Sequence, residues 1–177
     1  TATKITPGLI TSVVGVTGAS NTKILSTTTI TGDPASVDVA LTAGYTRYEL
    51  EVFNLAPGTD SIAWYVRLSN DGGSTFEADS GDYAYQGLRY ADDWNNISSS
   101  ATFISVHGSA GGAAGEIMNG TITITGALNA STMTFVHASL DGDNTAAEPT
   151  MFDTMGRYKT AEACNAVQIL PSSGTIS

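Results

Sequence analysis

Hydrophobic and polar residues alternate along most of this chain with the period of two that is typical of β-strands. The clearest runs lie at residues 36–41, 45–54 and 61–69. In the third run, Ile62 and Trp64 alternate with Tyr65 and Arg67. This pattern indicates strands with one face on a core and the other in water. Further strands are predicted at residues 83–90, 101–107, 115–125, 132–140 and 165–170.

The segments between these strands are rich in turn-forming residues. Pro57-Gly58 lies between the second and third runs, residues 70–74 (NDGGS) have the composition of a hairpin turn, and the link at 126–131 suits a short hairpin. Helix-favouring patterns are almost absent. About eight to ten short strands with frequent turns predict an all-β fold, an antiparallel β-sandwich or jelly roll.

The first 23 residues differ from the rest. They combine Pro7, Gly8, Gly15 and Gly18 with one short apolar run at 9–16 and show no long alternation. We therefore expect an N-terminal extended arm, or attachment segment, at residues 1–23 that is ordered by a neighbour, followed by a β-sandwich domain at residues 24–177.

Composition narrows the range of partners. The chain has 177 residues, with seven Lys and Arg against 17 Asp and Glu, and a net charge of −10. Seven basic residues are too few for a patch that follows a phosphate backbone, so nucleic acid is not an expected partner. No apolar run approaches the roughly 18 residues of a membrane helix, and no leader is recognisable, so no membrane partner is expected. The single Cys164 excludes an internal disulfide and a cysteine zinc site, and it fits a buried small hydrophobe.

Catalytic patterns are missing from the sequence. The only histidines, His107 and His137, lie in phase with apolar strand positions, so we expect strand residues with hydrogen-bonded rings rather than catalytic bases. Several carboxylates are concentrated in the predicted loops, where aspartate favours turns and increases solubility. The alternatives are that they bind a calcium ion or form the carboxylate pair of a glycosidase. The loop carboxylates are Asp79, Asp82, Asp92, Asp93, Asp141 and Asp143. We predict no enzyme activity, no cofactor and no metal.

Aromatic residues give the one binding signal. Several aromatic residues cluster in a Gly- and Asp-rich stretch, where their faces could stack on a sugar ring and the carboxylates could accept hydrogen bonds from its hydroxyls. The alternative is that the tyrosines belong to the core or a sheet edge and that the tryptophan caps a sheet end. The candidate glycan contacts are Tyr85, Tyr90, Asp92, Asp93 and Trp94.

Several segments in series resemble β-sandwich domains of tailed-bacteriophage virion proteins, of the tail-fibre or head-fibre kind. The segments are DPASVDV (33–39), GYTRYEL (44–50), RLSNDGGSTF (67–76), DYAY (82–85), NAVQIL (165–170) and SGTI (173–176). The resemblance covers about residues 30–177 and implies a virion appendage made in the bacterial cytoplasm. It carries over no catalytic residue, and it implies a homotrimer.

Three functions follow as hypotheses. The first is a structural component of a virion: a head fibre or spike, a tail fibre or a capsid decoration protein. It would contact other virion proteins through the N-terminal arm and could also contact the host surface. The alternative is a carbohydrate-binding module that recognises a host glycan. A glycan-degrading enzyme is the third, favoured only if two carboxylates converge in a cleft.

Overall fold

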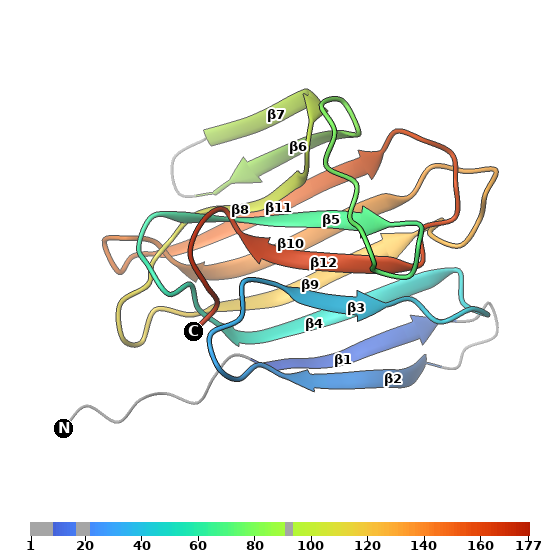
Figure 1. Cartoon of the computed structure of the whole chain (residues 1–177). Coiled ribbons are helices and arrows are strands. Elements are labelled where there is room, and N and C mark those ends of the chain that lie inside the picture. Colours follow the sequence, from blue (N-terminus) through green and yellow to red (C-terminus); the bar gives the residue numbers. More distant parts are fainter. Residues whose placement is uncertain (1–8, 17–21, 91–93) are drawn as a thin grey trace.

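The computed structural model describes residues 9–16, 22–90 and 94–177 of the chain. Twelve strands run through this part of the sequence (Figure 1). They are β1 (Leu9–Val16), β2 (Thr22–Thr29), β3 (Val37–Ala40), β4 (Arg47–Leu55), β5 (Ile62–Ser69), β6 (Tyr83–Arg89), β7 (Trp94–Ala101), β8 (Ile104–Ala110), β9 (Met118–Thr125), β10 (Phe135–Asp143), β11 (Pro149–Tyr158) and β12 (Ala166–Pro171). No helix of the described residues is long and apolar enough to cross a membrane.

The strands form two antiparallel sheets. One has eight strands in the order β2-β1-β4-β9-β10-β11-β6-β7, and the other has four in the order β3-β12-β5-β8. In Figure 1 the four-stranded sheet overlies the middle of the eight-stranded one. This arrangement confirms the predicted all-β antiparallel sandwich; the finer expectation of a jelly roll stays a prediction.

The core lies between the sheets and is built by alternate strand residues. In β4, Tyr48, Leu50 and Val52 are fully buried, whereas the intervening glutamates are partly exposed. β5, β9, β10 and β12 contribute in the same way, and all belong to one cluster of buried residues. Burial of each large apolar side chain stabilises the fold by about 1.5–3 kcal/mol. The sequence therefore keeps apolar residues at alternate positions of these strands, and this alternation made the strands predictable.

Three predicted features agree with the structure. The runs at 36–41, 45–54 and 61–69 correspond to β3, β4 and β5. The link at 126–131 joins β9 to its antiparallel neighbour β10, as a hairpin does. Gly126 has a φ of 77°, and a Cβ there would lie 2.7 Å from the Met133 carbonyl oxygen, so this turn requires glycine. Cys164 is fully buried, as expected.

Strand β11 was not predicted, although it lies inside the larger sheet. Its buried positions include Thr150, Thr154 and Gly156, whereas Met151 and Met155 point outward and are exposed. Phe152 and Tyr158 are buried on the same face, and Asp153 and Arg157 lie on the outward face with the methionines. Because both faces mix apolar with polar or small residues, the alternation is weak and the sequence pattern gives no clear sign of a strand here.

The expected hairpin at residues 70–74 is wrong. β5 belongs to the four-stranded sheet and β6 to the eight-stranded one, so residues 70–82 connect two sheets rather than two paired strands. Asp71 holds the first turn, because its carboxylate accepts hydrogen bonds from the backbone N–H and the hydroxyl of Thr75 at 2.9 and 2.7 Å. These bonds from Thr75, with one from Ser69, lower the pKa of Asp71 to about 2.

The structure also differs from the expected N-terminal arm. Leu9–Val16 forms β1, which pairs with β2 on one side and with β4 on the other. The expected domain boundary after Lys23 falls inside β2. Residues 1–8 and 17–21 lie outside the described residues. The segment punctuated by Pro7 and Gly18 therefore contains a strand of the larger sheet, because β4 supplies the pairing partner that the local sequence does not reveal.

Candidate functional site: an apolar sheet face and an aromatic cleft

His107 is buried against an aromatic ring. The residue is 1 % exposed, and its ring centroid lies 4.1 Å from that of Phe152. Neither ring nitrogen has a hydrogen-bond partner among the described residues, so the expected hydrogen-bonded ring is wrong for this residue. Burial, helped by the positive charge of Arg89, lowers the pKa of His107 to about 4, so the ring is neutral at pH 7.

His137 has a partner but lies on an open surface. Its Nε2 atom is 3.1 Å from a carboxylate oxygen of Asp153 on the neighbouring strand β11, and both side chains are well exposed. This agrees with the expectation of a strand histidine with a hydrogen-bonded ring. Within the described residues, no group of three or more His, Cys, Asp or Glu side chains is placed to hold a metal ion.

The candidate glycan contacts do not form one cluster. Tyr85 shares a face of β6 with the buried Tyr83 and Gly87. Tyr90, directly after β6, is exposed on the opposite face together with Leu88. Tyr90 donates its backbone N–H to the Met151 carbonyl and borders a shallow hollow beside Asp141. An odd sequence separation in a strand places two side chains on opposite faces, so Tyr85 and Tyr90 cannot grip one sugar ring together.

The remaining members of that set give no further geometry. Asp92 and Asp93 lie outside the described residues. The backbone of Trp94 begins β7 and pairs with Arg89 of β6. These three residues remain predicted glycan contacts.

Tyr85 instead belongs to an aromatic cleft that the sequence did not predict. Phe103, in the short link between β7 and β8, stacks on Tyr65 of β5 with ring centroids 3.6 Å apart and an angle of 12° between the planes. Tyr85 lies on the other sheet with its centroid 6.4 Å from that of Phe103, at 26°. The three rings therefore bridge the two sheets at the end where β7 continues into β8.

The rings border a hollow of about 380 Å³ whose other walls are small and uncharged. The Tyr85 hydroxyl donates to Oδ1 of Asn96 at 3.4 Å, and burial raises the pKa of Tyr85, so the phenol stays protonated. The lining residues are Ser61, Ala63, Tyr65, Tyr85, Asn96, Phe103, Ser105, Gly108, Ser109 and Ser172. The outward phase of Tyr65 in β5 was visible in the sequence, but its stacking on Phe103 was not.

Two of the lining serines have strained backbones. Ser61 and Ser109 have φ angles of 60° and 56°, in the left-handed region that few non-glycine residues occupy. Each precedes one member of the cross-strand pair Ile62 and Ala110, and the register of β5 and β8 shifts just beyond that pair. Strained residues and bulges of this kind concentrate at functional sites.

A second feature is the outer face, the side of the eight-stranded sheet that points away from the four-stranded sheet. Every exposed large hydrophobic side chain of the described residues sits at an outward position of this sheet or, for Tyr90, directly after β6, and none lies on the four-stranded sheet. They are Ile24, Phe53, Leu88, Tyr90, Ile97, Phe135, Met151 and Met155. Cross-strand pairing places polar residues among them: Met155 lies opposite His137 and Gln86, and Gln86 lies between Met155 and Ile97.

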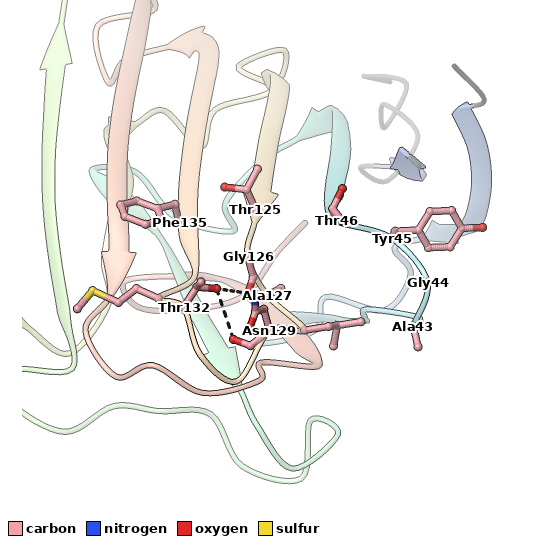
Figure 2. Close-up of a pocket in the computed structure, with 12 residues that line it drawn as sticks. Ala43, Gly44, Tyr45, Thr46, Thr125, Gly126, Ala127, Asn129, Thr132 and Phe135 are labelled. Atoms are coloured by element: carbon pink, nitrogen blue, oxygen red, sulfur yellow. Dashed lines mark hydrogen bonds between the residues drawn. The ribbon is translucent and has the colours of Figure 1, made fainter. Parts of the chain in front are cut away.

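The outer face is hollowed on both sides of Phe135. One hollow, of about 380 Å³, also involves Ile97 and Met155. The other, of about 670 Å³, lies at the end of the sheet, where Figure 2 shows Phe135 and Tyr45 on opposite sides of the turn at 126–129. Thr132 closes this turn by donating to the carbonyls of Gly126 and Asn129, both at 3.5 Å. The face therefore carries apolar projections and apolar hollows side by side.

Comparisons with known proteins add no relative. No family model, curated protein or solved structure matches the chain. Its functional interpretation therefore rests on the outer face, the cleft and the resemblance in sequence segments.

Proposed function

We propose that this protein is a non-catalytic structural component of a bacteriophage virion, assembled in the bacterial cytoplasm, whose outer face packs against neighbouring subunits. The observation that carries the assembly role is the confinement of all exposed large hydrophobic side chains of the described residues to that one face. Exposed apolar residues scattered over a whole surface are ordinary, whereas the restriction of all of them to one face favours an interaction site there. The virion assignment is supported by the segment resemblance.

The partner that we propose for this face is a second copy of the chain. The exposed side chains of Met155 and Ile97 can serve as projections, and the hollow between Phe135 and Leu128 can receive an apolar side chain. A surface that carries both projections and a hollow can pack against the same surface of another copy of the chain. The homotrimer implied by the resemblance is such an assembly, because a head-to-tail interface closes into a ring when its rotation is 120°.

The attachment to other virion proteins is proposed for the chain before Leu9. β1 is occupied by pairing with β2 and β4, so its backbone is not available to a neighbour. Residues 1–8 include Pro7 and Gly8 and carry no alternation of their own. The proposal therefore restricts the contact with the particle to these residues.

Light scattering combined with size exclusion tests the assembly role. We expect a trimer for the wild type and monomers for the double variant Ile97→Glu/Met155→Glu, because buried carboxylates without partners disfavour the interface. Ser80→Glu adds a charge at an exposed turn in the segment that connects β5 to β6, away from the outer face, and should leave the trimer intact. A wild-type monomer at micromolar concentration contradicts the proposal. Mass spectrometry of purified particles tests the virion assignment.

Recognition of a glycan is a second candidate function. The observation that favours it is the aromatic cleft, where Tyr65, Phe103 and Tyr85 border an uncharged hollow. The two functions can coexist, because the cleft and the outer face lie on different parts of the molecule. A virion subunit assembled through its outer face leaves the cleft open to the outside.

A further inference from the structure

We propose that the cleft between β5, β7 and β8 is a binding site for a neutral saccharide, with Tyr65 and Phe103 as its apolar platform and Asn96 as its amide contact. The inference rests on glycan recognition as the second candidate function. It is independent of assembly through the outer face, because none of the three residues belongs to that face.

The size and walls of the cleft match a short saccharide. Ligand pockets span about 300–1,000 Å³, so a hollow of about 380 Å³ is at the small end and suits one or two sugar rings. Sugar rings have apolar faces formed by C–H groups, which pack on aromatic planes, and hydroxyls at their edges. Tyr65 and Phe103 stack face to face and cover one face of each other, so the outer face of this stack is the platform that we propose for the sugar.

The polar walls are arranged for hydroxyl groups rather than for charges. Four serines line the hollow, and a hydroxyl both donates and accepts. Oδ1 of Asn96 accepts a hydrogen bond from the Tyr85 hydroxyl. The amide nitrogen of Asn96 can therefore donate to a ligand oxygen. No Asp, Glu, Lys or Arg is among the described residues that line the hollow. A charged ligand would lose hydration without gaining an opposite charge, so the site favours a neutral one.

The strained serines fix the polar wall in place. Ser61 and Ser109 hold their left-handed conformations at the bulged pairing of β5 with β8. A rigid wall reduces the conformational entropy that is lost when a ligand binds. The cleft therefore needs little rearrangement to receive a sugar.

NMR titration of the folded wild-type chain tests the proposal. The probes are methyl glucoside, methyl galactoside and N-acetylglucosamine, raised well above a dissociation constant on the order of 1 mM. We expect at least one neutral sugar to shift the signals of Tyr65, Phe103 and Asn96. Glucuronate should bind more weakly than the corresponding neutral glucoside. No response to any neutral sugar, or equal binding of glucuronate, overturns the proposal.

Two variants locate the site. Tyr65→Ala removes one ring of the stack and should weaken binding roughly tenfold or more. Asn96→Trp fills the hollow and leaves the Tyr65–Phe103 stack in place, so it should abolish binding even if the first variant unfolds. Thermal unfolding of both variants shows whether the fold is retained.

Tyr90→Ala is the matched control, because Tyr90 is an exposed aromatic residue on the outer face. It should leave sugar binding unchanged. If Tyr90→Ala or Trp94→Ala abolishes binding while Asn96→Trp does not, the sugar binds elsewhere and the proposal is wrong. The trimer-disrupting pair Ile97→Glu/Met155→Glu should still bind sugar, which separates failure of this inference from failure of the assembly role.

Discussion

Trp64 and His107 pair across β5 and β8, and both bury ring nitrogens that have no hydrogen-bond partner among the described residues. The two residues are 0 % and 1 % exposed. A buried polar group without a partner costs about 1–3 kcal/mol, so this pair is a local weakness in the core. Its consequences should appear when the pH changes.

We expect the protein to lose stability as the pH falls from about 6.5 to about 4. The pKa of His107 is about 4 in the folded chain, whereas an unfolded histidine has one near 6.5. In this window the unfolded chain binds one more proton, so the free energy of unfolding decreases with falling pH, by about 3 kcal/mol in total. Urea unfolding of the wild type at a series of pH values measures the slope.

His107→Leu separates this effect from the titration of the carboxylates. The variant cannot take up the proton, so its stability should fall less steeply than that of the wild type over the same window. His137→Gln, at an exposed strand position, is the control and should follow the wild type closely. Parallel curves for the wild type and His107→Leu would mean that the buried ring is not responsible.

Gly156→Ala should destabilise the sandwich. A Cβ at this position of β11 would lie 2.6 Å from Cγ2 of Ile104, a fully buried residue of β8 in the opposite sheet. Overpacking of this kind costs about 1–3 kcal/mol, because the core is already dense. Chemical denaturation of the variant measures the loss.

Ile104→Ala provides the test of this contact. Alone it should cost about 2–5 kcal/mol through the cavity it leaves. Combined with Gly156→Ala, which fills part of the same space, the total loss should be smaller than the sum of the two single losses. Strict additivity would contradict a direct contact between the two positions.

Removal of residues 1–23 should leave a folded but less stable chain that associates with itself. β1 covers the backbone of β4, and without it β4 becomes an edge with unpaired N–H and C=O groups. The core strands from β3 onward remain, so the thermal transition should stay cooperative and shift to lower temperature. Calorimetry and light scattering measure both changes.

Deletion of residues 1–8 alone is the matched comparison. It keeps β1 paired with β4, so we expect wild-type stability together with loss of incorporation into particles. If the longer deletion melts at the wild-type temperature and stays monodisperse, β1 contributes nothing to the sheet. If the shorter deletion still enters particles, the proposed attachment is wrong.

Local alternation was sufficient to predict the strands whose core faces are strongly apolar. Alternation in β4 and β5 placed Leu50 and Trp64 in the core, and it also placed Tyr65 on the outward side of its strand. These predictions succeed because the period of a strand is local: each residue's face follows from its neighbours two positions away.

Which strands share a sheet and which aromatic residues meet depends on contacts between distant parts of the chain. β11 has a glycine at position 156 where Ile104 of the opposing β8 leaves no room for a Cβ, and this requirement is not visible in the segment itself. Tyr65 and Phe103 are brought together by a link that crosses from one sheet to the other. Pairing between residues far apart in the chain fixes such contacts, so a pattern with a range of a few residues cannot encode them.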